Sequence, residues 1–231
     1  MKGSMKLKNE PTKSTPSSSV GGEIKYGDLL CLFLFGSVSG VIIEGVFCLM
    51  TKGVWESHVV SVWGWFNVLY GLGAVGLYVG AIKLRRKSLL SRIVVLTMIA
   101  TVLELICGLI LRFGLGMRAW DYSGNFMNVG GIICLKFSLC WAGLALLVCV
   151  NANRIERILM RLRQKNNYIV CFCLSVFLAL NFGFTAASIA RWSERHYGYE
   201  PSSNFEKVLD SAANDEWMQN RFVEWRFLDE I

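Results

Sequence analysis

Long apolar runs dominate the pattern of hydrophobic and polar positions along the chain. Five of them approach or exceed the roughly 20 residues that a helix needs to cross the hydrocarbon core of a bilayer. They occupy residues 29–50, 59–82, 93–111, 132–150 and 169–190. A helix pairs its backbone groups within the segment, whereas a barrel strand would be shorter and would alternate strictly. The pattern therefore predicts an all-α, polytopic membrane helical bundle with about five transmembrane helices.

The polar stretches at the two ends divide the chain into three predicted regions. Residues 1–27 are rich in Lys, Ser and Thr, which is typical of a disordered arm. Residues 28–191 form the predicted transmembrane helical domain. Residues 192–231 are predicted to be a soluble tail that is helical from Asn204, which would act as an N-cap.

An aromatic and apolar stripe runs along the predicted tail helix. Met218, Phe222 and Trp225 recur at helical spacing. One interpretation is that the stripe rests on the bundle or at the membrane interface, where Trp is favoured. The alternative is that it docks a partner protein.

Basic residues predict the orientation in the membrane. Lys and Arg cluster in the N-terminal arm and in the loops after the second and fourth runs, whereas Lys52 stands alone between the first two runs. Short cytoplasmic loops carry an excess of Lys and Arg, so five spans place the N-terminus inside and the C-terminus outside. The last third of the fifth run, residues 181–190, is small and polar. Without this span the tail would lie in the cytoplasm.

Composition narrows the classes of function. Of 231 residues, 54% are hydrophobic and 18% are charged, whereas a soluble domain has about 25% charged residues. The basic residues behind the net charge of +7 lie in the predicted cytoplasmic arm and loops, so the charge indicates topology and not a nucleic-acid-binding surface. We therefore expect the lipid bilayer as a partner and no nucleic acid. All eight Cys lie in the apolar runs without the spacing of a zinc site, and we expect no metal.

Sequence signatures of catalysis are missing as well. We find no Gly-x-Ser-x-Gly elbow, no His-Glu-x-x-His helix and no phosphate-binding loop. We therefore expect no catalytic residues and no cofactor. An intramembrane enzyme that uses paired carboxylates is the third and weakest class of function.

Polar residues inside the apolar runs mark a candidate site. Ionisable residues in a span are costly and usually face the bundle interior or a water-filled cavity. The predicted topology gathers several of them, from four runs and one loop, in the outer leaflet. The candidate pocket consists of Glu44, Asn67, Tyr70, Glu104, Asp121, Asn128 and Lys136.

Two interpretations of this pocket remain open. It could be a buried network in which Lys136 offsets one of the two Glu residues, while the other Glu is protonated or binds Arg118. It could instead be an outward-facing pocket that binds a small polar or charged ligand, or that carries a proton.

A distinctive motif lies in the loop between the third and fourth runs. Trp120, Asp121, Tyr122 and Ser123 precede Gly124, and Asn128, Ile133-Cys134-Leu135 and Phe137-Ser138-Leu139-x-Trp141 follow. Upstream stand Gly40-x-x-x-Glu44, Gly64-x-Phe66-Asn67-x-x-Tyr70-Gly71 and Val102-Leu103-Glu104. In this order, over roughly residues 30–150, the motifs resemble the bacterial ABC-transporter permease family of the CmpB type (ABC-transporter type IV).

The resemblance implies a permease-like subunit of a transporter in the bacterial plasma membrane. Such a subunit works with a separate ATPase subunit, either alone or as a homo-oligomer. The chain departs from the family pattern at Gly130 and Ile132, where the family usually has Asn and Arg, and at Ser57-His58, where it usually has Arg-Gly. A ligand that uses those polar groups would bind differently here, or not at all.

The basic loops 83–92 and 152–166 are the candidate docking sites for an ATPase. Contact with anionic lipid is the simpler interpretation of the same residues. The alternative class of function is a membrane scaffold or sensor that transports nothing and acts through its C-terminal tail.

Overall fold

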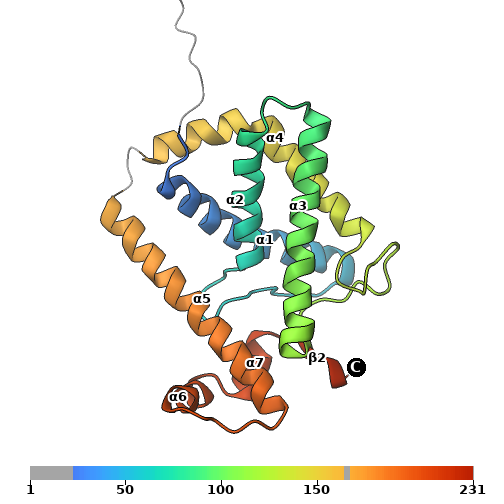
Figure 1. Cartoon of the computed structure of the whole chain (residues 1–231), viewed down its shortest axis with the longest axis vertical. Coiled ribbons are helices and arrows are strands. Elements are labelled where there is room, and N and C mark those ends of the chain that lie inside the picture. The colour runs from blue at the N-terminus through green and yellow to red at the C-terminus, as the bar shows by residue number, and fades with distance from the viewer. Residues whose placement is uncertain (1–22, 164–166, 231) are drawn as a thin grey trace, which may run out of the picture.

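Helices make up most of the architecture, which confirms the all-α prediction (Figure 1). The computed structural model describes residues 23–163 and 167–230. Its main helices are α1 (Tyr26–Lys52), α2 (Val68–Lys83), α3 (Leu89–Leu109), α4 (Leu135–Arg163), α5 (Tyr168–His196), α6 (Asn204–Ala212) and α7 (Asp215–Arg221). A π-helical turn, Ile110–Gly114, extends α3. The predicted disordered arm lies, up to residue 22, outside the described residues.

Four of the described helices are long and apolar enough to cross a membrane. They are α1, α3 with its π-helical turn, α4 and α5. The second predicted span differs, because α2 has only 16 residues and is about 24 Å long. The prediction of a helix throughout residues 59–82 is therefore wrong for residues 59–66, which are irregular.

The irregular segment before α2 is stable because α5 satisfies its backbone. The amide of Val62 donates to Thr185 Oγ1 at 2.8 Å. Trp63 donates its amide to Asn181 Oδ1 at 3.1 Å and accepts from Asn181 Nδ2 at 2.7 Å. Non-helical backbone at membrane depth is tolerated where protein groups pair it in this way. The small polar end of the fifth run is thus the partner of this segment.

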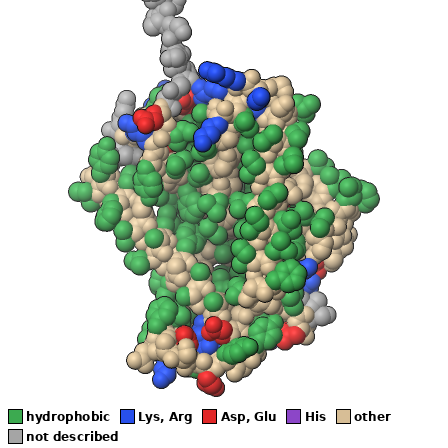
Figure 2. Space-filling model, in the orientation of Figure 1, with side chains coloured by type: hydrophobic (Ala, Val, Ile, Leu, Met, Phe, Trp, Pro, Cys, Tyr) green, Lys and Arg blue, Asp and Glu red, His purple; other side chains and the backbone are tan. Residues whose placement is uncertain are grey.

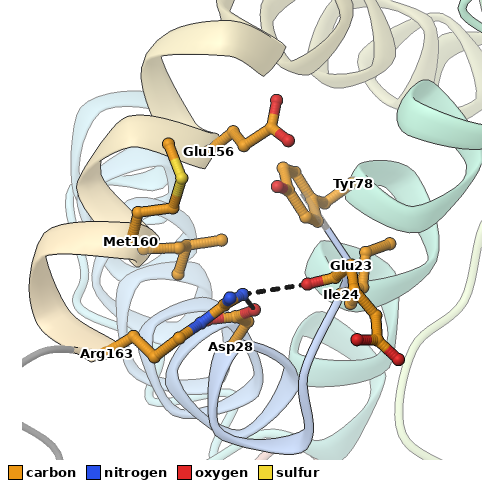
Figure 3. Close-up of a pocket in the computed structure, with 8 residues that line it drawn as sticks. Glu23, Ile24, Asp28, Tyr78, Glu156, Met160 and Arg163 are labelled. Carbon is orange, nitrogen blue, oxygen red and sulfur yellow. Dashed lines mark hydrogen bonds and ion pairs between the residues drawn. The ribbon is translucent and has the colours of Figure 1, made fainter. Parts of the chain in front are cut away.

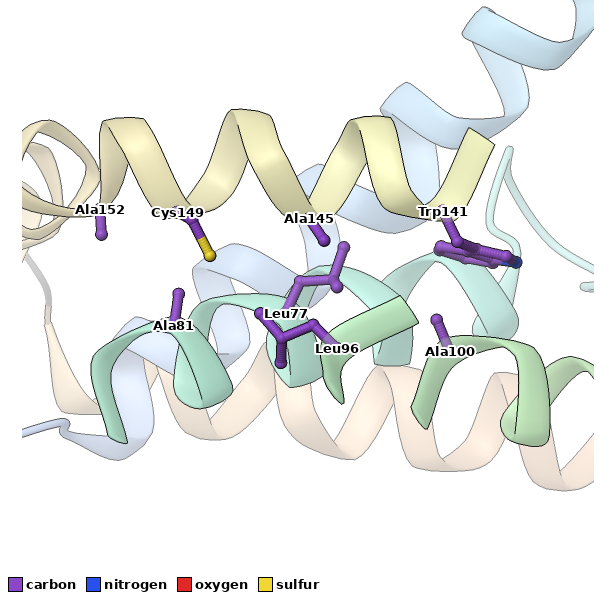
Figure 4. Close-up of a cluster of buried hydrophobic side chains, with 8 residues drawn as sticks. All are labelled: Leu77, Ala81, Leu96, Ala100, Trp141, Ala145, Cys149 and Ala152. Carbon is purple, nitrogen blue, oxygen red and sulfur yellow. The ribbon is translucent and has the colours of Figure 1, made fainter. Parts of the chain in front are cut away.

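Small residues allow α2, α3 and α4 to pack closely (Figure 4). Ala81 and Ala145 are completely buried, and Leu77 and Leu96 fill the space between the helices. Trp141 closes one end of this core. Close approach of backbones is the usual means of helix association in membranes. The buried cluster consists of Leu77, Ala81, Leu96, Ala100, Trp141, Ala145, Cys149 and Ala152.

Glycines set the contact between α1 and α2. A Cβ atom on Gly40 would lie 2.3 Å from the Tyr70 ring, and one on Gly36 would lie 2.4 Å from the Cβ of Ala74. Gly76 and Gly80 of α2 are four residues apart, as Gly36 and Gly40 are, but a Cβ atom on Gly76 would meet nothing within 4 Å. Only the pair on α1 therefore packs against the neighbouring helix through both of its glycines.

The outer surface is that of a membrane protein. Figure 2 shows a broad band of hydrophobic side chains, with Lys and Arg gathered at the upper end beside the grey trace and most acidic side chains at the lower end. Large apolar side chains of α1 and α5, such as Phe35 and Phe172, are about 70% exposed. Exposure of this kind is expected where lipid is the solvent.

The C-terminal tail folds against the lower ends of α3 and α5 (Figure 1). Its helix is interrupted: α6 begins after Ser203, which caps it in place of the predicted Asn204, and ends at Ala212. Strand β2 (Arg226–Phe227) then pairs antiparallel with β1 (Met117–Arg118) of the α3–α4 loop, and a 3₁₀ turn, Leu228–Glu230, follows.

The aromatic stripe of the tail is buried within the chain. Met218, Phe222 and Trp225 are at most 6% exposed and pack with Trp192 of α5 and Met117 of β1. The structure therefore places the stripe on the bundle. Helix α5 continues past the predicted boundary at residues 191–192 and ends at His196.

Candidate functional site

Glu104 is a buried carboxylate held by two donors. It lies on α3 and is 5% exposed. Tyr122 of the α3–α4 loop donates its hydroxyl to Oε1 at 3.1 Å, and Trp141 of α4 donates Nε1–H to Oε2 at 3.0 Å. Both carboxylate oxygens are thus satisfied by aromatic side chains, which fix the carboxylate between three segments of the chain.

Glu44 is the second carboxylate in this half of the bundle. It lies on α1 and accepts a hydrogen bond from the hydroxyl of Tyr70 on α2. His58, in the segment between these helices, places Nε2 3.5 Å from Glu44 Oε1. The contact with Tyr70 depends on Gly40, whose lack of a side chain leaves room for the Tyr70 ring.

Tyr122 hydrogen-bonds to Glu104 and also feels the charge of Glu44. Burial raises the pKa of Tyr122, and the charges of Glu104 and Glu44 raise it further. Its ring stacks on Phe137 of α4, with centroids 4.3 Å apart. Tyr122 therefore remains a neutral hydrogen-bond donor to Glu104.

Lys136 and Arg118 do not neutralise these two carboxylates. The Lys136 Nζ lies 5.5 Å from the centroid of Phe47 and 5.4 Å from that of Phe137, in cation–π range. Among the ion pairs within residues 23–163 and 167–230, none involves Lys136, and Arg118 pairs with Asp121. The predicted network in which Lys136 or Arg118 offsets a buried Glu is therefore not the arrangement observed.

The loop motif folds the loop over the bundle. Trp120 donates Nε1–H to the carbonyl of Ile132 at 2.8 Å. Asp121 accepts the amide of Ser123 at 2.9 Å, and this hydrogen bond lowers the pKa of Asp121. Asn128 donates to the carbonyl of Ser123 at 3.0 Å. These predicted pocket residues hold the loop in the conformation that brings Tyr122 to Glu104.

Asn67 also has a local role in the structure. Its side chain caps α2 by accepting from the Leu69 amide at 2.9 Å, and it donates to the carbonyl of His58 at 2.7 Å. Of the seven predicted pocket residues, the structure therefore joins Glu44 with Tyr70 and gives Glu104 its own donors. It places Asp121 and Asn128 in the loop scaffold, and Lys136 is exposed over aromatic rings.

Sequence reasoning missed Trp141 and His58. Trp141 stands in the family motif, and its indole N–H, buried in an apolar helix, needs an acceptor, so Glu104 could have been foreseen as its partner. His58 had no such signal. Its approach to Glu44 depends on a loop conformation with φ of 43°, which a pattern of residue types does not reveal.

A polar cavity lies at the opposite end of the bundle (Figure 3). Arg163 of α4 forms an ion pair with Asp28 of α1 and donates to the carbonyl of Glu23 at 3.0 Å. Glu156 of α4 binds Arg85 at 3.2 Å. Sequence reasoning treated these arginines as topology signals, whereas in the structure they also join α1, α4 and the loop after α2.

Comparison with known proteins identifies the family. A family model described as "Putative ABC-transporter type IV" (ABC_trans_CmpB) matches residues 31–186, well over half of the chain. The chain belongs to this family. The match confirms the resemblance drawn from the motifs and extends it across most of α5. No curated protein and no solved structure matches the chain.

Proposed function

We propose that this multi-pass member of the ABC-transporter type IV family is a permease-like subunit whose outer half contains a polar pocket around Glu44 and Glu104. The observation that carries the proposal is the pair of carboxylates inside a helical bundle, each hydrogen-bonded to a tyrosine hydroxyl. Ionisable residues at such depth are costly and usually serve a ligand, ion or proton pathway. We expect a small polar or cationic ligand, or a proton, to exchange at these carboxylates.

The proposed topology places the basic end in the cytoplasm of a bacterial cell and the C-terminal tail outside. Four long spans plus α2 with its preceding segment give five crossings, and the Lys and Arg side chains gather at one end. A reporter fused after residue 231 tests this directly. A cytoplasmic signal from that reporter would overturn the five-crossing topology.

The separate ATPase subunit would dock at the basic end. Arg86 and Lys87 are exposed in the loop between α2 and α3. Mild-detergent purification of the tagged chain followed by mass spectrometry should recover a nucleotide-binding subunit in stoichiometric amount. A double variant, Arg86→Glu with Lys87→Glu, should lose that subunit, whereas Glu216→Gln in the exposed part of the tail should retain it.

The pocket is tested in the purified complex, reconstituted in proteoliposomes. Glu44→Gln and Glu104→Gln should each lower proton flux, or the ATPase turnover coupled to it, at least tenfold, because the amide no longer exchanges a proton. Glu216→Gln is the matched control. If both pocket variants fold and remain fully active, the carboxylates are structural and the pocket proposal fails.

The scaffold alternative now has a specific requirement. The stripe of Met218, Phe222 and Trp225 is buried, so a partner that binds it must first release the tail. A partner that is recovered without any ATPase, and is lost on deletion of residues 204–231, would favour the scaffold over the permease.

A further inference from the structure

A cluster of metal-binding residue types lies where α1 ends. Cys48, Glu56 and His58 each direct a donor atom into one small region, and these atoms lie within 4.8 Å of one another. Cys48 Sγ is 3.3 Å from Glu56 Oε2, and His58 Nε2 is 3.7 Å from the same oxygen. Glu44 lies beside this group, because its Oε1 is 3.5 Å from His58 Nε2, but it is not within 4.8 Å of all three donors.

These separations fit a tetrahedral zinc ion. Zinc binds nitrogen and oxygen at about 2.0–2.2 Å and sulfur at about 2.3 Å, so neighbouring ligands of a tetrahedron lie about 3.3–3.8 Å apart. The three measured separations, 3.3, 3.5 and 3.7 Å, fall in this range. The donor atoms of Cys48, Glu56 and His58 therefore need little movement to bind an ion, whereas Glu44 must move closer to complete the tetrahedron.

The imidazole of His58 is oriented as a metal ligand requires. Its Nδ1 lies 3.3 Å from the carbonyl oxygen of Glu56, a contact that the Nδ1–H tautomer satisfies. That tautomer leaves the lone pair of Nε2 directed at Glu44 and Glu56. A hydrogen bond from the second ring nitrogen to a carbonyl is the usual support of a histidine ligand.

The backbone around His58 is held in an uncommon conformation. Its φ of 43° is rare for a residue other than glycine, and such conformations cluster at functional sites. Two contacts, one from the start of α2 and one from the distant tail, maintain it. Asn67 Nδ2 donates to the carbonyl of His58 at 2.7 Å, and the amide of Ser57 donates to Glu224 of the tail at 2.8 Å.

The charges of the cluster would balance around a divalent ion. A thiolate and two carboxylates supply three negative charges, and Lys52, whose Nζ lies 2.7 Å from Glu56 Oε2, supplies one positive charge. A divalent cation provides the remaining two. Cysteine and histidine ligands favour zinc over calcium or magnesium, which prefer oxygen ligands alone.

We propose that Cys48, Glu56 and His58, with Glu44 as the fourth ligand, form a binding site for Zn²⁺ at the C-terminal end of α1. Four protein ligands make a closed, structural type of site. A bound ion clamps the segment between α1 and α2 onto α1. The site shares Glu44 with the proposed pocket, but it depends on Cys48, Glu56 and His58 and requires no transport activity.

Cobalt titration of the purified full-length protein in detergent tests this site, after removal of metal with a chelator. Co²⁺ should produce a thiolate-to-cobalt charge-transfer absorption in the near ultraviolet and visible bands typical of tetrahedral coordination. Addition of Zn²⁺ should abolish both. Cys48→Ser should eliminate the charge-transfer band, whereas Cys140→Ser, at an exposed position on α4, should leave it unchanged.

A second variant guards against loss of folding. His58→Asn should lower the affinity for Co²⁺ at least tenfold while Asn tolerates the left-handed backbone, and His196→Asn should have no effect. Gel filtration establishes that each variant is folded. Absence of the charge-transfer band in the folded parent protein, or its persistence in folded Cys48→Ser, would overturn the site. Neither result depends on the proposed transport function.

Discussion

The docking of the tail depends on a buried arginine clamp. Arg191 of α5 is 2% exposed and holds both oxygens of Asp210 of α6, through Nε at 2.9 Å and Nη2 at 3.0 Å. Arg195 adds a third hydrogen bond, at 2.6 Å, to the same carboxylate. The substitution Asp210→Asn removes the negative charge and leaves two guanidinium groups beside a neutral amide.

The free-energy cost of Asp210→Asn follows from the burial of the Arg191–Asp210 ion pair. Breaking a buried ion pair by removing one partner costs about 3–5 kcal/mol. The Asp210 side chain is 23% exposed, so we expect about 2–4 kcal/mol for release of the tail from α5. Since about 1.4 kcal/mol is a factor of ten, the released fraction should rise roughly 30- to 700-fold.

Chymotrypsin cleavage measures this fraction. Phe222 and Trp225 are at most 6% exposed and become cleavable only when the tail is released, whereas Tyr199 and Phe205 are exposed and report the activity of the protease. When opening is fast compared with cleavage, the rate follows the open population. Glu216→Gln, an exposed change of the same kind on α7, is the control. Equal rates of cleavage after Phe222 in Asp210→Asn and in this control would refute the reasoning.

The same arginine clamp predicts how release of the tail depends on pH. Burial opposes the ionisation of Asp210, but the hydrogen bonds from Arg191 and Arg195 outweigh it and lower its pKa below the usual value. A lowered folded-state pKa contributes stability that is complete above the unfolded value of about 3.9 and is lost as the pH falls through the folded value. Cleavage after Phe222 should therefore be constant from pH 7 to pH 5, and an acid-stable protease should detect release only below about pH 4.

Two further changes test the packing of the bundle by thermal unfolding in detergent. Gly40→Ala should destabilise the protein by about 1–3 kcal/mol, because its Cβ would lie 2.3 Å from the Tyr70 ring. The control Gly76→Ala should be neutral or stabilising. Equal effects of the two substitutions would contradict the assigned α1–α2 contact. Asn181→Ala should cost about 2–4 kcal/mol, because it leaves both the amide and the carbonyl of Trp63 unpaired. The control is Asn151→Ala, because the Asn151 side chain donates to the Leu147 carbonyl within α4; it should cost under about 1 kcal/mol. A similar loss of stability in both variants would show that the segment before α2 does not depend on α5.

The length of the apolar runs predicts the long helices, because a helix that crosses the lipid needs little more than a sufficiently long apolar run. Their ends were less predictable, since α4 continues to Arg163 through charged residues that the sequence pattern assigned to a loop. Residues 59–66 were assigned to a helix because hydropathy does not distinguish an apolar helix from a buried extended segment. The distinguishing hydrogen bonds come from Asn181 and Thr185, more than 100 positions along the chain.

For the candidate site, too, the sequence pattern indicates the buried carboxylates but not the side chains that contact them. Depth within the spans draws attention to Glu44 and Glu104, because a carboxylate in lipid needs partners wherever it lies, and in the structure a tyrosine hydroxyl donates to each. The identity of those partners depended on side-chain direction. Tyr122 and Trp141 supply the hydrogen bonds to Glu104, while Lys136, one turn into the predicted span, is directed towards aromatic rings instead.

The irregular segment between α1 and α2 contacts the tail and Glu44 of α1, and leads into α2. The tail binds its backbone, because Arg221 donates to the carbonyl of Ser61 at 2.9 Å and Glu224 accepts the amide of Ser57. The same segment carries His58 to Glu44 and ends at Asn67, which starts the helix that presents Tyr70. A change that releases the tail therefore removes the Ser57–Glu224 contact that helps to position His58, and the Arg221–Ser61 contact three residues beyond His58. For this reason the tail is a structural support of the polar region around Glu44, and a partner that captured the tail would also alter the environment of Glu44.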